Sequence, residues 1–264
     1  MLPAWLTDTV TTDFDRALHY TGLWGLEGVE LRAVGGPTSV VPHVNERRLR
    51  ARLEEHELPV VAVVPGIFEG PASDRTARLN EVAALAETCA FAKRIGAPLV
   101  VASSFAREDA PVSDLGPLTS DLLRRAGDVA ARHGLRLALL NEADGAYPTG
   151  AALAGLLAAA NHPAVGAAWS PAEASAAGET PEAGLAALGT RVWHVRVRDG
   201  EVREGSFEDA EVGTGALGWP GILGALAAQG YRGALSLEVR AEPKAKTGLR
   251  SATALIRAAR AATR

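Results

Sequence analysis

Short apolar runs alternate along the chain with longer stretches whose apolar residues recur at helical spacing. This alternation predicts parallel βαβ units. Strands are expected near residue 4 and over residues 28–32, 59–66, 98–105, 135–142, 165–171, 192–199 and 233–240. Expected helices include residues 45–56, 75–95, 118–133, 149–160, 221–229 and 247–262. Eight such units predict a single (β/α)8 TIM barrel, with residues 1–264 forming one domain.

Glycine, threonine and proline support these boundaries. Glycine follows several helical runs directly before a strand, where a left-handed helix end favours it. The glycines concerned are Gly96, Gly134 and Gly230. Thr149 is placed to cap a helix, and Pro181 and Pro220 lie where helices are expected to begin. A doubly wound open sheet is the alternative fold, but it would need a glycine-rich phosphate loop after the first strand, and the sequence has none there.

Composition narrows the classes of function. The 264 residues carry a formal net charge of -4, which argues against a nucleic-acid partner because binding to phosphates needs a basic surplus. No apolar run approaches the length of a membrane helix, so no membrane partner is expected. A single cysteine, Cys89, cannot form an internal disulfide, and with no evident signal peptide this predicts a cytoplasmic protein.

The ends of the strands carry the candidate chemistry, because catalytic groups in TIM barrels gather at the carboxyl ends of strands. Residues two apart on a strand share a face, so His194, Arg196 and Arg198 are expected to face the barrel interior. On the same strand Trp193, Val195 and Val197 are expected to face the helices. Glu238 and Arg240 share a face of the last strand. A charge in the interior needs a partner, which makes Arg196 and Glu238 a candidate ion pair.

Further candidates lie at the ends of the other strands. Those expected to bind substrate are Glu30, Arg32, Asn141, Trp169, Glu173, His194, Arg198 and Arg240. Glu238, Arg196 and Glu142 are the candidate catalytic residues. Because a strand-end charge is often only a solvated loop anchor, the assignment is strongest for Arg196 and Glu238, which lie within apolar runs. The remaining histidines show no spacing typical of metal ligands.

Several segments resemble the sugar phosphate isomerase/epimerase family of xylose isomerase-like TIM barrels. The resemblance covers most of the chain, in the order and spacing of its motifs. They are GLWGLEGVELR, HELPVVAV, ARHGLRLALLNE, HPAVGAAWSPAEA, VWHVRVRD and the closing stretch from Val212 to Arg240. The resemblance implies a barrel in which a divalent metal and two glutamates enolise a sugar. It also leaves open that the protein forms a homodimer, since barrels of this family often form dimers.

The metal-ligand positions that the resemblance implies are mostly not ligands here. The fifth-strand glutamate corresponds to Leu140, the sixth-strand aspartate to Ser170 and its nearby histidine to Glu173. The seventh-strand histidine corresponds to Arg196, and the eighth-strand glutamate is retained as Glu238. Since leucine and arginine cannot bind a divalent ion, we expect no metal and no other cofactor.

Two functions remain open. The first is an enzyme with acid/base chemistry on a small polar, sugar-like substrate without the family metal. In it Arg196 supplies a fixed positive charge, and Glu238 with Glu142 or Glu173 moves protons. The arginines at strand ends favour an anionic substrate. The second is a catalytically inactive barrel that binds a small ligand or a partner protein.

Overall fold

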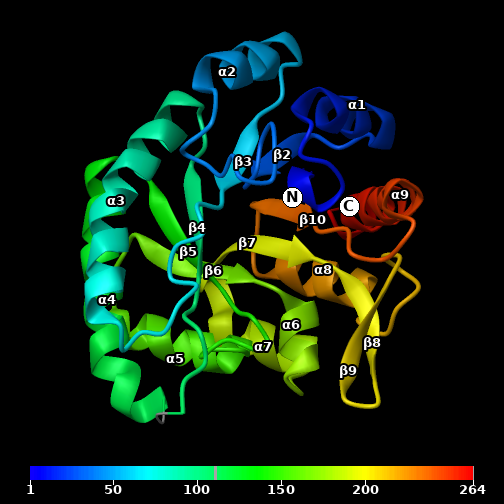
Figure 1. Ribbon diagram of the computed structural model, residues 1–264. Coiled ribbons are helices and arrows are strands. Elements are labelled where there is room, and N and C mark those ends of the chain that lie inside the picture. Colours follow the sequence, from blue (N-terminus) through cyan, green and yellow to red (C-terminus); the bar gives the residue numbers. More distant parts are fainter. Residues whose placement is uncertain (110–111, 264) are drawn as a thin grey trace.

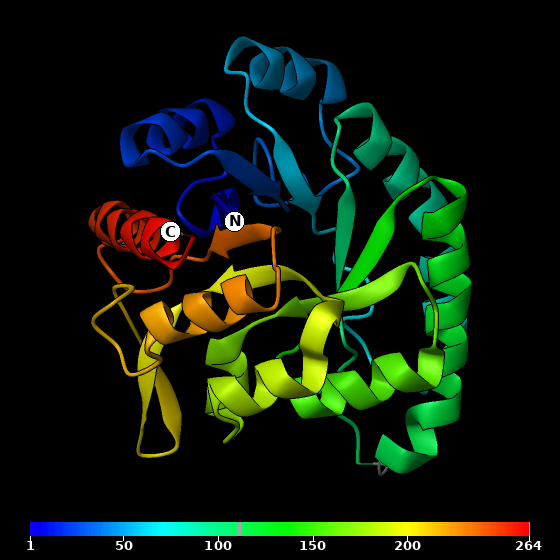
Figure 2. The ribbon, with the colours of Figure 1, turned by 180° about the vertical axis from the view of Figure 1, so that it is seen from behind.

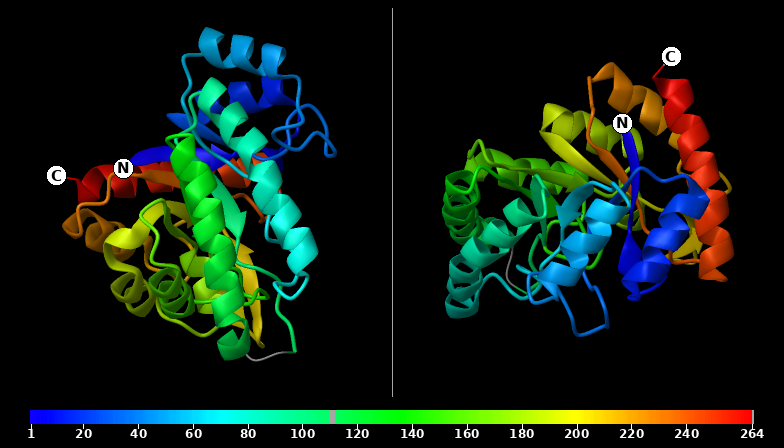
Figure 3. Two further views of the ribbon diagram at one scale, coloured as in Figure 1. Left: turned by 90° about the vertical axis from the view of Figure 1, so that its left-hand side faces the viewer. Right: turned by 90° about the horizontal axis from the view of Figure 1, so that it is seen from above.

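A computed structural model describes residues 1–109 and 112–263 and confirms the (β/α)8 barrel. Eight parallel strands close in the order β1-β10-β7-β6-β5-β4-β3-β2, and helices surround them (Figures 1 and 3). The barrel strands are β1 (Leu2–Leu6), β2 (Gly28–Leu31), β3 (Val60–Val63), β4 (Leu99–Ser103), β5 (Arg136–Leu140), β6 (Val165–Trp169), β7 (Val192–Val197) and β10 (Ala234–Leu237). The parallel pairing places all the carboxyl ends of these strands at one mouth.

The helices follow the expected pattern with differences at their ends. They are α1 (Phe14–Trp24), α2 (Glu46–Glu55), α3 (Arg75–Arg94), α4 (Val112–Arg132), α5 (Gly150–Ala160), α6 (Pro171–Ala176), α7 (Pro181–Leu188), α8 (Trp219–Ala228) and α9 (Lys244–Ala262). Thr149 caps α5 through a hydrogen bond from the Ala152 N–H, as expected. Helix α4 begins earlier than residue 118 and includes Pro117. Helix α9 begins at Lys244, directly after Pro243, and not at residue 247.

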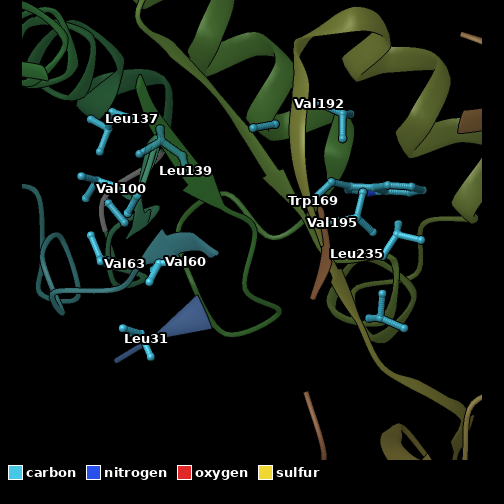
Figure 4. Packing of buried hydrophobic residues seen from close by; sticks show 14 of the residues in the cluster. Leu31, Val60, Val63, Val100, Leu137, Leu139, Trp169, Val192, Val195 and Leu235 are labelled. Carbon is cyan, nitrogen blue, oxygen red and sulfur yellow. The ribbon is translucent and has the colours of Figure 1, made fainter. Parts of the chain in front are cut away.

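Hydrophobic side chains form two layers. The larger layer lies between the strands and the helices, and Figure 4 shows part of it, including Leu139, Trp169 and Val195. The smaller layer fills the barrel interior with Ala62, Leu99, Val101, Ala138 and Ala168. Strands buried on both faces explain why their sequences read as continuous apolar runs. The polar side chains that replace apolar ones in the inner layer therefore define the site.

Strand β7 departs from regular alternation at Trp193. Its pairing with β6 runs from Ala167–Val192 to Ala168–His194, which leaves Trp193 as an extra residue at an irregularity. Val195 and Val197 face the helices as expected. The expectation that Trp193 faces the same way is wrong, because its side chain packs against the inner layer.

A hairpin between β7 and α8 is the main element that the sequence pattern did not predict. Strands β8 (Asp199–Arg203) and β9 (Ser206–Ala210) pair antiparallel. They extend away from the barrel (Figures 1 and 2). The turn contains Glu204 and Gly205, both with positive φ, as a tight hairpin turn requires. The hairpin lies next to the mouth, since β8 continues from the carboxyl end of β7.

Candidate functional site

A buried arginine occupies the centre of the barrel. Arg196 lies on the inward face of β7, and only 2% of it is exposed. Its Nη2 donates a 2.6 Å hydrogen bond to Glu30 Oε1, and its Nη1 donates a 3.2 Å bond to Glu238 Oε2. The expected pairing of Arg196 with Glu238 is therefore present. Two carboxylates flank one guanidinium, so the desolvated charge of Arg196 is compensated from both sides.

Glu30 is the most enclosed member of this cluster. It lies on β2, across the barrel from β7, and is fully buried. His194 Nε2 lies 3.2 Å from Glu30 Oε2, and the Ser236 hydroxyl donates to the same oxygen. Burial alone would raise the pKa of Glu30, but the charges of Arg196 and His194 and these hydrogen bonds outweigh it, so the pKa lies well below its usual range. Glu30 therefore anchors Arg196 and is enclosed away from the mouth.

Glu238 links the buried cluster to the mouth. It directly follows β10, and its Oε1 accepts a 2.6 Å hydrogen bond from Arg240 Nε. Burial would raise the pKa of Glu238, but the charges of Arg196, Arg240 and Arg198 lower it overall. The side chain of Arg240 is 51% exposed. Arg240 therefore presents a guanidinium to solvent at the edge of the cluster.

Arg198 serves a different purpose from the one its position in the sequence suggested. Its guanidinium bonds Asp209 on β9, at 2.8 and 2.9 Å, and Glu173 on α6. It also lies 5.3 Å from the ring centroid of Phe207. The guanidinium of Arg198 is thus paired with carboxylates of the protein itself, and it connects the hairpin and α6 to the end of β7. Glu173 also bonds the Ala143 N–H at 3.0 Å, which joins the β5 loop to this group.

Glu142 differs from the other glutamates at this end of the barrel. It follows β5 on the inward face and is only partly exposed. Burial raises the pKa of Glu142, and the negative charges of Glu173 and Asp144 raise it further. A hydrogen bond with Ser103 and the charge of Arg196 lower it. The pKa is raised overall, so Glu142 keeps its proton to a higher pH than an ordinary glutamate. A partly buried carboxyl group with a raised pKa is a typical candidate for general acid/base chemistry.

The remaining candidates lie outside this cluster. Arg32 pairs with Asp8 at 2.8 Å, and its side chain is 40% exposed at the end of β2. Asn141 is buried and faces outward, where its amide bonds the main chain of Pro148 and Ser170. Trp169 packs among the outer hydrophobic side chains (Figure 4). The structure thus places Asn141 and Trp169 in supporting positions, with no side-chain access to the mouth.

The donor set does not fit a divalent metal. Of the positions matched to metal ligands, Leu140 is apolar, Ser170 caps α6, and Arg196 carries a positive charge. Glu238 and Glu173 offer carboxylates, but Glu238 is already paired with two arginines and Glu173 with Arg198. Within residues 1–109 and 112–263, no three His, Cys, Asp or Glu side chains converge as a metal site. A cation at this place would have to displace the guanidinium.

Two partners in the site were not anticipated. Asp209 holds Arg198, and Ser236 bonds Glu30. Ser236 faces inward two residues before Glu238 on β10, so the alternation of the strand could have identified it. Asp209 carries no such signal, because it lies in a polar segment that gave no strand pattern.

Comparisons with known proteins agree with the barrel fold. The sequence profile of the xylose isomerase-like TIM barrel family matches residues 22–259. The chain therefore belongs to the xylose isomerase-like TIM barrel family. It matches no curated protein in sequence.

Solved structures share the fold at low sequence identity. L-ribulose 3-epimerase superposes with a TM-score of 0.82 and 16% identity, over 99% of this chain and 95% of the other. The IolI protein with a bound zinc atom gives a TM-score of 0.83 and 16% identity, over 100% and 98%. A D-tagatose 3-epimerase-like protein gives 0.80 and 17%, over 99% and 98%. At such identities the likeness establishes the fold, and function has to be argued from the site. In the described part of the chain, no helix is long and apolar enough to cross a membrane.

Proposed function

We propose that the barrel mouth is the active site of an enzyme that moves protons on a small, sugar-like and anionic substrate, with Arg196 in the place of the family's metal. One observation carries the proposal. A buried guanidinium occupies a position that the family resemblance assigns to a metal ligand, and two carboxylates hold it there. A fixed positive charge in a water-excluded interior stabilises developing negative charge, as a metal ion does.

Proteins with the same fold indicate a class of substrate. Similar structures include enzymes named as epimerases of L-ribulose and of a 3-keto-D-glucoside, and a D-allulose 3-epimerase in complex with D-allulose. These names describe the relatives. They support a polyhydroxy substrate here because polar side chains lie at the strand ends of this mouth.

The exposed arginines at the mouth favour a substrate with an anionic group. Arg240 is half exposed, and Arg32 is exposed to a similar degree, whereas Arg196 and Arg198 are buried in ion pairs. A carboxylate or phosphate is the group that a guanidinium recognises best. Arg240 is therefore assigned to bind the anionic group of the substrate.

Glu142 is the proposed acid/base group. In its ionised form it removes a proton from the carbon beside a carbonyl, and the electron pair of the broken C–H bond moves to the carbonyl oxygen to form an enolate. Returning the proton gives an epimer or an isomer. Glu238 has a lowered pKa and two arginine partners, so it is a weak base and serves better to hold Arg196 and Arg240.

A second candidate is a barrel that binds its ligand without turning it over. It is favoured by one observation: both Nη atoms of Arg196 are occupied by Glu30 and Glu238, so the central charge is already neutralised. Under this hypothesis Arg240 still binds an anion, but Glu142 moves no proton.

Exchange of solvent deuterium into the substrate separates the two candidates. The protein is incubated in D2O with a panel of ketoses, keto acids and sugar acids, and the C–H signal next to each carbonyl is followed by NMR. We expect catalysed exchange for at least one anionic, sugar-like compound, lost in Glu142→Gln and retained in the surface variant Glu182→Gln. Binding without any exchange would favour the second candidate.

A further inference from the structure

The opposite end of the barrel, where the strands begin, carries a second group of polar side chains. A cavity of about 280 Å³ opens there, with walls that include Leu2, Pro59 and Leu99. An adjoining cavity of about 510 Å³ lies toward Gln229 and Tyr231. Both are lined by Arg136, Trp193 and Arg232. This end lies away from the mouth, and the proposed chemistry does not use it.

Two arginines at this end have no acidic partner in the described residues. Arg136 opens β5, and its guanidinium carbon lies 5.0 Å from the ring centroid of Trp193. Arg232 lies between α8 and β10, and among residues 1–109 and 112–263 its side chain donates only to the Tyr231 carbonyl oxygen. Both side chains are exposed. Arginines at the mouth, in contrast, form ion pairs with carboxylates. Two uncompensated guanidiniums beside one cavity favour an anion there.

The inner end of the smaller cavity adds an independent observation. His194 lines this cavity and is 1% exposed. Its Nε2 faces Glu30, but its buried Nδ1 has no hydrogen-bond partner among the described residues. A buried polar atom left without a partner is costly, so a polar group is expected beside it.

The inward turn of Trp193 builds the wall between these groups. A Cβ at Gly166 would collide with the Trp193 ring, so the glycine on β6 makes room for the indole. The indole, Leu2 and Leu99 give the cavity an apolar middle between the arginines at its rim and His194 at its inner end. A ligand that fits all three parts has an anionic end, a short apolar body and a polar group at the other end.

We propose that the amino-terminal end of the barrel is a binding site for a small hydroxy-carboxylate. Arg136 and Arg232 bind the carboxylate, Trp193 and Leu99 contact the carbon chain, and His194 Nδ1 forms a hydrogen bond with the hydroxyl group. The proposal does not rest on the chemistry proposed at the mouth, although His194 Nε2 contacts Glu30 of the buried cluster.

The test uses 4-hydroxybutyrate as the probe, with butyrate lacking the hydroxyl group and 1,4-butanediol lacking the charge. Calorimetry on the full chain measures affinity, and NMR of labelled histidines reports contact with His194. We expect 4-hydroxybutyrate to bind more tightly than either analogue and to shift the His194 signals but not those of His133. Removing one guanidinium in Arg136→Gln or Arg232→Gln should weaken binding about tenfold.

Two controls keep the outcomes distinct. Arg260→Gln makes the same charge change on α9, and Arg240→Gln makes it at the mouth; neither should alter the affinity. If Arg136→Gln impairs folding through loss of its contact with Trp193, Arg232→Gln decides the question. Binding lost in Arg240→Gln but kept in Arg232→Gln would place the ligand at the mouth and overturn the proposal. No binding of 4-hydroxybutyrate, or equal binding of all three probes, would also overturn it.

Discussion

The Nη2 atom of Arg196 lies 2.6 Å from Oε1 of Glu30, and both side chains are closed off from solvent. The two residues come from β7 and β2, which are not neighbours in the sheet. The ion pair therefore crosses the barrel interior. Together with Glu238, it places a compensated positive charge where the family resemblance expects a metal site.

Breaking this cluster from one side should destabilise the fold. Arg196→Leu leaves Glu30 buried without its guanidinium partner and leaves Glu238 with Arg240 alone, so the free energy of unfolding should fall by about 3–5 kcal/mol. The double variant Arg196→Leu/Glu30→Gln should lose less than the sum of the two single changes. Urea unfolding measures all four proteins. Arg32→Leu, which breaks a partly exposed pair, should cost at most about 1 kcal/mol. Additive effects at Arg196 and Glu30 would contradict the pairing.

Acid should weaken the fold through Glu30. Its folded pKa is lowered, so its stabilisation is present above the ordinary glutamate pKa of about 4.3 and is lost as the pH falls toward the folded pKa. Between about pH 7 and about pH 3, the free energy of unfolding should therefore fall more steeply in the wild type than in Glu30→Gln. Urea titrations at several pH values provide the measurement, with Glu182→Gln as a surface control. Parallel curves for wild type and Glu30→Gln would refute the assignment.

Glu142 should show the opposite dependence. Its folded pKa is raised, so its contribution to stability is present below its unfolded pKa and is lost as the pH rises through the folded pKa. Glu142→Gln, which is always neutral, should be at least as stable as the wild type at about pH 8. Deuterium exchange into the substrate should nevertheless fall about 10²- to 10⁴-fold. A variant with unchanged exchange would remove Glu142 from the mechanism.

Arg240 should determine affinity for an anionic substrate without affecting the fold. Its side chain is half exposed, so Arg240→Gln should unfold at nearly the wild-type temperature. Binding of the substrate found by deuterium exchange should weaken about tenfold through loss of one charge-assisted interaction. Isothermal titration measures this, with Arg260→Gln as the control. Equal affinity in Arg240→Gln would move the anion site elsewhere.

The inward position of Trp193 can be tested at Gly166. Gly166→Ala places a methyl group against the indole ring, so the free energy of unfolding should fall by about 1–3 kcal/mol. Gly155→Ala on α5 meets no atom within 4 Å and replaces glycine by a better helix former, so it should be neutral or stabilising. If both variants had the same stability, Trp193 would have to face the helices after all.

The barrel could be predicted from the sequence because alternating strand and helix periods persist through the whole chain. Strand alternation also placed Arg196 and Glu238 in the interior. It failed at Trp193, since an irregularity in β7 shifts the alternation and the sequence alone does not mark it. Glu30 was identified as a site residue, but its contact with Arg196 depends on closure of the barrel across the interior. The hairpin from Asp199 to Ala210 lacks an apolar face, so no pattern predicted it.

The metal content of the purified protein shows whether Arg196 or a divalent ion occupies the centre of the barrel mouth. Cells are grown with added manganese, cobalt and zinc, and the protein is purified without chelator before elemental analysis. We expect a content far below one ion per chain, unchanged in Glu238→Gln, because Arg196 occupies the place of the cation. About one divalent ion per chain, lost in Glu238→Gln, would show that the guanidinium yields to a metal and would contradict this expectation.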